Sequence, residues 1–156
     1  MTSPRLTLGS WLYRACFSHR RRVIQYHDTV EFVPPIHGGI VIKVYDGDTI
    51  TVATTLKERH WFCGKPTLYR FRVRLRGIDS PEMKGSSEEE KAKAIRARDA
   101  LSAQILGKEV RLRNVGNEKY GRVLADVYFQ EVHMNRWMLD QGYAQPYDGG
   151  TKLPLA

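Results

Sequence analysis

In the stretch YRFRVRLRGIDSPE, residues 69–82, an arginine occupies every second position from 70 to 76. Because side chains alternate between the two faces of a strand, this spacing predicts a β-strand over residues 68–76, with arginines on one face and apolar side chains on the other. The apolar face would close the core of a barrel. We expect Gly77 to form a β-bulge that turns Asp79 toward the same site as Arg74.

Four other segments have strand character. The β-branched runs at residues 40–44 and 49–54 flank the turn Tyr-Asp-Gly-Asp at 45–48, which indicates a hairpin. Residues 110–112 and 123–129 predict two more strands, joined by a loop at 114–121. The segment 57–66 between the second and third strands is expected to be a long polar hairpin tip.

Two helices complete the predicted elements. Ser87 and Glu90 form a capping box, and apolar residues at helical spacing follow until Gly107 ends the helix. A second short helix is expected at about residues 134–141. Five strands with one helix between the third and fourth is the element order of an OB-fold barrel. We therefore expect a mainly β fold, a five-stranded OB barrel with two packed α-helices.

The chain of 156 residues has room for one such domain. The motif VPPIHGG at 33–39 predicts a boundary between a basic N-terminal arm (1–35) and the barrel domain (36–150), followed by a short tail (151–156). The arm contains five arginines and no acid before Asp28. This composition fits an organellar presequence, a nucleic-acid-binding arm or a solvated tail.

The net charge of +8 favours a polyanionic partner, because clustered Lys and Arg displace the counterions around nucleic acid. No apolar run is long enough to span a bilayer. A secretory signal is not evident, so an intracellular protein is expected.

Acidic and basic side chains gather near three turns, in YDGDT, RVRLRGIDSPE and EKYGR. Aspartates with a backbone carbonyl and water are the oxygen ligands that Ca²⁺ or Mg²⁺ prefers. Guanidinium groups match the oxygens of a phosphodiester that gain charge during hydrolysis, and a carboxylate can take the proton of an attacking water. Together these residue types indicate phosphodiester hydrolysis.

Each group also has an ordinary structural interpretation. Asp-Gly is a common hairpin signal, and Asp-Ser-Pro starts many turns. Alternating arginines can be a solvated face that keeps a strand from pairing with another molecule, or a basic apron for the substrate backbone. We expect one of these two roles for Arg70, Arg72 and Arg76.

The motifs YDGDT, R-x-R-L-R-G-I-D-S-P-E and K-Y-G-R, in this order and with a capped helix after the second, resemble the staphylococcal nuclease (thermonuclease) family over about residues 36–145. The resemblance implies an OB barrel, Ca²⁺ as the cofactor and DNA or RNA as the substrate. The third, C-terminal helix of the bacterial enzyme has no counterpart in this sequence.

The resemblance also implies roles for individual residues. Asp48, Asp79 and the backbone carbonyl of Ser80 correspond to calcium ligands, and Asp46 corresponds to an acid that orients the waters of the ion. Glu82 corresponds to the general base. The residues that would contact the phosphate or the nucleotide are Arg74, Arg122, Lys119, Tyr120 and, near a stacking position, Tyr147.

Other interpretations stay open. The chain could be a binding module of this fold without catalysis, although such modules lack one or more of the acids or arginines that are present here. Slight sequence specificity and a monomeric state are expected. A zinc site is a further alternative, with the ligands Cys16, His19, His60 and Cys63.

Overall fold

The computed structural model describes residues 23–56, 66–84 and 87–149, and the chain divides into two compact units, Met1–Phe32 and Val33–Ala156. In the first unit the described residues form one short 3-10 helix, η1 (Tyr26–Asp28), in which no residue is buried. The amide of Gln25 donates to Asp28 Oδ2 across this turn at 3.0 Å. The barrel and both α-helices belong to the second unit.

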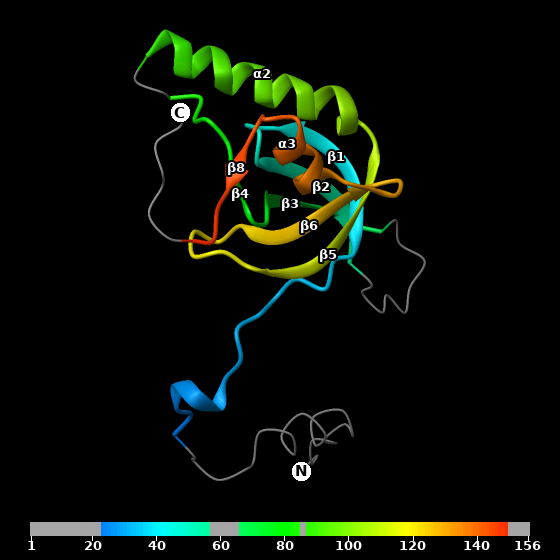
Figure 1. Ribbon diagram of the computed structural model, residues 1–156. Coiled ribbons are helices and arrows are strands. Elements are labelled where there is room, and N and C mark those ends of the chain that lie inside the picture. Colours follow the sequence, from blue (N-terminus) through cyan, green and yellow to red (C-terminus); the bar gives the residue numbers. More distant parts are fainter. Residues whose placement is uncertain (1–22, 57–65, 85–86, 150–156) are drawn as a thin grey trace, which may run out of the picture. The chain divides into compact units, whose positions relative to one another are not determined.

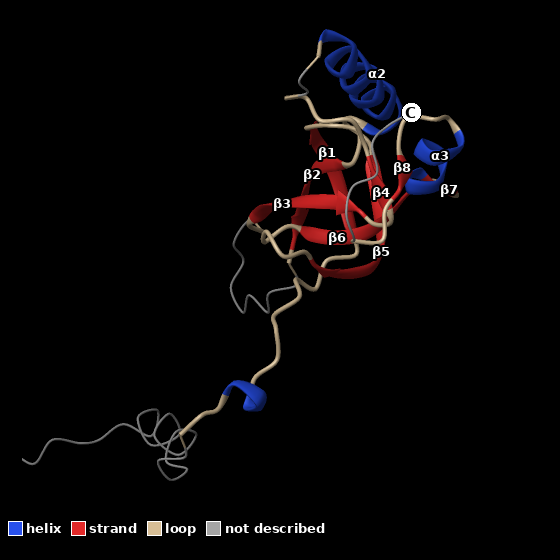
Figure 2. Cartoon of the chain, turned by 60° about the vertical axis from the view of Figure 1, so that its left-hand side comes forward, coloured by secondary structure: helices blue, strands red, loops and turns tan. Residues whose placement is uncertain are grey.

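Five strands close into a barrel, as Figures 1 and 2 show. They are β1 (Gly38–Val44), β2 (Thr49–Thr55), β3 (Leu68–Leu75), β5 (Glu109–Asn117) and β6 (Val123–Phe129). Neighbours in the order β3-β2-β1-β5-β6 pair antiparallel, and a parallel pairing of β3 with β6 closes the ring. Three two-residue strands are added at the margins: β4 (Ile78–Asp79), β7 (Val132–His133) and β8 (Gln145–Pro146). The expected mainly β barrel with two helices is confirmed.

Alternation along the strands fills the barrel. On β2 and β3 the inward side chains are Ile50, Val52, Val73 and Leu75, all fully buried. On β1 it is Val41 that faces the core, while Ile40 is exposed. A Cβ atom on Gly38 would meet the carbonyl of Val110, so glycine lets β1 lie close to β5.

Helix α2 (Glu88–Ile105) lies across one end of the barrel (Figures 1 and 2). The predicted capping box is present: Glu90 N donates to Ser87 Oγ at 3.1 Å, and Ser87 N donates to Glu90 Oε2 at 3.4 Å. The expected apolar face is buried, at Ala94, Ala97, Leu101 and Ile105. Gly107 has a φ of 72°, a conformation that side chains disfavour, and it follows the end of the helix as predicted.

Helix α3 (Met134–Asp140) is joined to the barrel by one buried polar side chain. Asn135 Oδ1 accepts from Val127 N at 2.9 Å, and Nδ2 donates to the carbonyls of Arg76 at 2.9 Å and Ala125 at 3.3 Å. Asn135 therefore holds the helix against β6 and against Arg76, the residue that follows β3.

Two expectations about local structure are wrong. The expected loop at 114–121 is shorter, because β5 continues to Asn117 over an irregularity between Arg113 and Gly116. Asn114 adopts a φ of 51° there, which asparagine tolerates better than most residues. Gly77, with a φ of 75°, lies in a turn and not in a bulge, and this turn leads into β4.

Arg76 is also different from the expectation of a solvated or apron arginine. Its Nη2 atom donates to the carbonyl of Asn114 at 2.6 Å and lies 3.5 Å from the carbonyl of Leu124. The turn at Gly77 directs this side chain across β6 toward β5, where backbone acceptors are available.

Several expectations lie outside the described residues. These are the basic arm up to residue 22, the hairpin tip from 57 to 65, the C-terminal tail with the expected lack of a third helix, and the zinc ligands Cys16, His19, His60 and Cys63. Within residues 23–56, 66–84 and 87–149, no helix combines the length and apolar character needed to cross a bilayer.

Candidate active site

The turn between β1 and β2 presents Asp48 at the mouth of the barrel. Asp46 Oδ1 accepts from Asp48 N at 3.2 Å, and the Asp48 carbonyl accepts from Leu75 N at 2.8 Å. A Cβ atom on Gly47 would lie 2.8 Å from Ser80 Cβ and 2.9 Å from Ala97 Cβ. Only glycine therefore allows this turn to lie close to the segment of Ser80 and to α2.

Asp48 is a buried carboxylate, with 3% of its surface exposed. Its Oδ2 atom accepts from Arg74 Nη1 at 2.7 Å and from the amide of Ser80 at 3.2 Å, and its Oδ1 atom accepts from Thr49 Oγ1 at 2.8 Å. Burial and repulsion from Asp46 raise the pKa of Asp48 to about 6, although Arg74 and Thr49 act in the opposite direction.

Arg74 joins two acidic segments. Its Nη1 atom contacts Asp48, and its Nη2 atom donates to Asp79 Oδ1 at 2.8 Å. Burial opposes the charge of this guanidinium, but the two carboxylates outweigh it and raise the pKa of Arg74 above its ordinary value. Arg74 and Asp79 share one site as predicted, although the turn at Gly77 and the pairing of β4 with β8 bring them together.

A second arginine lies beside this group. Arg122 Nε donates to Glu118 Oε2 at 3.1 Å, and Arg122 Nη1 donates to Thr49 Oγ1 at 3.4 Å. Burial alone would raise the pKa of Glu118, but hydrogen bonds from Arg122 and from the amide of Tyr120 outweigh it and lower the pKa below the ordinary value. Thr49 thus connects Arg122 to Asp48, and Glu118 holds Arg122 from the other side.

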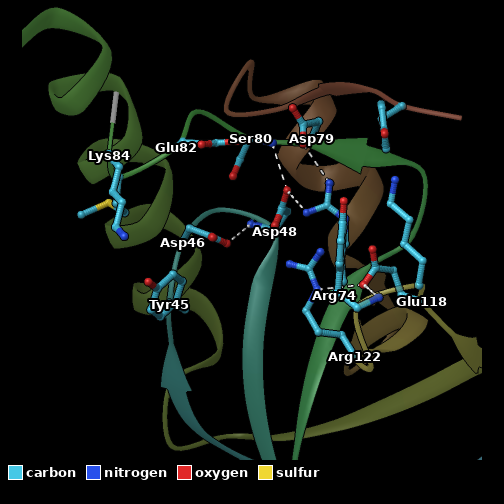
Figure 3. Close-up of a pocket in the computed structure, with 14 residues that line it drawn as sticks. Tyr45, Asp46, Asp48, Arg74, Asp79, Ser80, Glu82, Lys84, Glu118 and Arg122 are labelled. Carbon is cyan, nitrogen blue, oxygen red and sulfur yellow. Dashed lines mark hydrogen bonds and ion pairs between the residues drawn. The ribbon is translucent and has the colours of Figure 1, made fainter. Parts of the chain in front are cut away.

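Asp48, Arg74, Asp79, Glu118 and Arg122 line a pocket of about 430 Å³, drawn in Figure 3. Asp48 lies near its centre, with Arg74 and Arg122 on one side and Asp46 on the other. All ten residues singled out from the sequence line the pocket: Asp46, Asp48, Arg74, Asp79, Ser80, Glu82, Lys119, Tyr120, Arg122 and Tyr147.

Three further predicted substrate-contacting residues line the pocket, Lys119, Tyr120 and Tyr147. Lys119 and Tyr120 are exposed, with Lys119 Nζ 5.0 Å from the centre of the Tyr120 ring. The Arg74 guanidinium lies 5.8 Å from the centre of the Tyr147 ring. Tyr147 is held there because its amide donates to the carbonyl of Gly77 at 3.0 Å.

Sequence reasoning missed four lining residues: Tyr45, Met83, Lys84 and Glu118. Tyr45 and Glu118 each begin a motif, YDGDT and EKYGR, and Glu118 also stands four positions before Arg122. At that spacing an acid and an arginine in a tight turn can meet.

The carboxylates and the backbone carbonyl in this site would offer only oxygen atoms to a metal ion, and oxygen ligands suit a hard divalent cation. Burial and the neighbouring Asp46 disfavour the negative charge of Asp48 and raise its pKa. A bound cation would stabilise that charge. Among the residues that the structure describes, no three His, Cys, Asp or Glu side chains form a metal-binding group. A bound ion would therefore rely on two carboxylates, a backbone carbonyl and water.

A small closed β-barrel with a charged pocket at its mouth is the architecture of an OB-fold domain. The family described as staphylococcal nuclease homologue matches residues 72–152, more than half of the chain. The chain belongs to the staphylococcal nuclease family.

Individual relatives agree with this assignment. An uncharacterized endonuclease of Haemophilus influenzae is 35% identical over 115 residues, which cover 74% of this chain and 55% of that protein. An uncharacterized endonuclease of Escherichia coli is 31% identical over 121 residues, covering 77% of this chain and 67% of that protein. A probable staphylococcal-like nuclease of rice is 32% identical over 85 residues, covering 54% of this chain and only 24% of that protein. The chain thus spans about half or less of the length of several relatives.

Proposed function

We propose that this chain is a calcium-dependent nuclease that hydrolyses phosphodiester bonds of DNA, RNA or both with little sequence specificity. The observation that carries the proposal is the pair of hydrogen bonds from Arg74, one to Asp48 and one to Asp79, within a pocket that Arg122 and Glu82 also line. Two relatives are named endonucleases, which supports the hydrolysis of phosphodiester bonds as the reaction class.

Asp48, Asp79 and the backbone carbonyl of Ser80 would hold Ca²⁺, with Asp46 orienting the surrounding water. Bound Ca²⁺ supplies positive charge that polarises a phosphate oxygen. Asp48 is held in place without the help of substrate, because Thr49, Arg74 and the amide of Ser80 each donate to it.

The arginines bind and stabilise the phosphate. A guanidinium offers a planar fork of donors that matches two phosphate oxygens, and its charge is most useful when the oxygens gain charge in the transition state. Arg74 has only 12% of its side-chain surface exposed and Arg122 has 25%, so water competes weakly for both groups. The orientation of Arg122 is set by Glu118 and Thr49.

Glu82 takes a proton from the attacking water. It lines the pocket on the same segment as Asp79 and Ser80 and is exposed to solvent, as a group that must reach water requires. Figure 3 shows Glu82 beside Ser80 and across the pocket from Arg122.

Lys119, Tyr120 and Tyr147 contact the nucleotides next to the phosphate. An aromatic ring can stack on any base, and a lysine can contact any phosphate, so neither group reads sequence.

The decisive experiment uses the purified full chain on single-stranded and duplex DNA and RNA, each with Ca²⁺, with Mg²⁺ and with a chelator. Cleavage with Ca²⁺ that chelation abolishes supports the proposal. Binding without cleavage in the presence of Ca²⁺ would instead identify a non-catalytic binding module.

A further inference from the structure

The outward face of β3 continues beyond the pocket as a row of arginines. Arg70 and Arg72 are exposed, whereas the alternate residue Val73 is buried inside the barrel. Arg74 is on the same face of the strand as these two, and it reaches into the pocket. Arg76 leaves the row, since it turns to the carbonyl of Asn114.

The neighbouring strands add positive charge and no acid to this face. In the antiparallel register Arg72 is opposite Thr51 and Arg70 is opposite Ala53 on β2. On the other side of Thr51, its partner on β1 is Lys43, which is also exposed. Apart from Arg74, which pairs with Asp48 and Asp79, the residues of β1, β2 and β3 include three cations, Lys43, Arg70 and Arg72, and no carboxylate. The positive charge of these three residues is therefore not compensated within the three strands.

The spacing of the arginines fits an extended strand of nucleic acid. Two extended residues contain six backbone bonds and span about 7 Å. One nucleotide also contains six backbone bonds from one phosphorus atom to the next, so an extended single strand repeats its charge at nearly the same interval. In a duplex, by contrast, the phosphates of one strand wind around the helix axis, with a rise of about 3.4 Å each along that axis, so they do not follow a straight row of side chains.

We propose that Arg72 and Arg70 form a phosphate-binding row for single-stranded nucleic acid, leading away from the pocket along β3. This inference rests on the proposed function and adds a substrate class to it: the strand that is cut at the pocket lies extended on the outer face of the barrel. Affinity then grows with substrate length until the row is filled.

Protection of an open edge is the competing explanation. β6 pairs with β3 only at Val73, Arg74 and Leu75, so the first half of β3 lacks this neighbour. Charged residues on such an edge hinder pairing with another molecule. If Arg70 and Arg72 only protect the edge, their loss should affect the binding of short and long substrates equally. If they bind phosphates, their loss should weaken the binding of long substrates alone.

The test compares two double variants of the full chain. The first variant, Arg70→Gln with Arg72→Gln, removes the row. The control, Arg96→Gln with Lys108→Gln, removes the same number of charges from two exposed positions, one within α2 and one after it. Binding to a 12-nucleotide single strand and to the matching duplex is measured in Ca²⁺ over a salt series, with Glu82→Gln added to both to slow cleavage. Cleavage of a trinucleotide is measured with Glu82 intact.

The row variant is expected to bind the single strand about tenfold more weakly at low salt. The slope of log Kd against log salt concentration should be smaller by about 1.4, because each of the two lost phosphate contacts contributes about 0.7 to this slope. Cleavage of the trinucleotide stays the same, because it fills only the pocket.

An unchanged slope, an equal loss in the control, or an equal loss of duplex binding would overturn the row. Failure of the unaltered chain to cleave any substrate would instead overturn the proposed function, while the binding comparison would still decide the row.

Discussion

Arg74 and Asp48 are 26 residues apart in the chain, and their side chains meet at 2.7 Å. The other terminal nitrogen of the same guanidinium reaches Asp79 at 2.8 Å. One planar group therefore fixes the separation of two carboxylates that come from different turns. This arrangement depends on the fork of an arginine, since the ammonium of lysine is a single point charge.

Replacing Arg74 with lysine should lower kcat/KM at least about 100-fold, because loss of one preorganised donor at a developing oxyanion costs that much. Arg98→Lys is the matched control, since Arg98 pairs with Asp99 on α2, away from the pocket. Steady-state cleavage of a defined oligonucleotide measures both. A loss below tenfold for Arg74→Lys would limit this residue to substrate binding.

Removal of Ca²⁺ with a chelator should abolish cleavage, and added Ca²⁺ should restore it. Asp79→Asn should raise the Ca²⁺ concentration for half-maximal activity by about tenfold or more, because it removes a charged ligand. Asp140→Asn, on the exposed surface of α3, should leave this concentration unchanged. Equal responses of the two variants would show that Asp79 does not hold the ion.

Glu82→Gln should lower kcat by about 100-fold or more, because the amide cannot accept the proton of water. Its Ca²⁺ dependence should stay close to that of the unaltered chain, since Glu82 is not assigned to the ion. Glu88→Gln removes another exposed acid, at the start of α2, and should have no effect. An intact turnover rate in Glu82→Gln would mean that another group is the base.

Glu118→Gln should destabilise the fold by about 1 kcal/mol at pH 7 through loss of the charged partner of Arg122. The pKa of Glu118 is lower in the folded chain than its ordinary 4.5, so its contribution is present above that pH and is lost as the pH falls through the folded pKa. The difference in Tm should therefore shrink below about pH 4.5.

Glu131→Gln is the control for Glu118, because the ion pair of Glu131 with Arg111 is exposed. It should change Tm little at any pH. A constant difference between Glu118→Gln and the unaltered chain down to pH 3 would contradict the charge-based explanation.

Asn135→Ala should lower the free energy of unfolding by about 2–4 kcal/mol, since it leaves the buried amide of Val127 without its acceptor and opens a cavity. Arg136→Ala, the next residue on α3, removes only an exposed ion pair and should cost less than about 1 kcal/mol. Denaturant unfolding monitored by tryptophan fluorescence separates the two. Equal effects would show that Asn135 does not join α3 to the barrel.

Much of the fold could be predicted because its signals are local. The capping box of Ser87 and Glu90 and the alternation of β3 each involve residues within a few positions of one another. The sequence also indicated ten of the residues that line the pocket, including Tyr147. These features depend on backbone geometry and hydrophobic periodicity, which short segments already express.

The chain itself determined which acids and arginines are present and which strands carry them. The tertiary structure decided their long-range partners: Arg74 bridges Asp48 and Asp79, Arg76 turns to β5, and Arg122 meets Thr49. These choices arise from the pairing of β3 with β6 and of β4 with β8, which join segments far apart in sequence. A long polar side chain forms a hydrogen bond with whichever acceptor the folded backbone brings within reach. The distance between that donor and its acceptor cannot be predicted from a local sequence pattern.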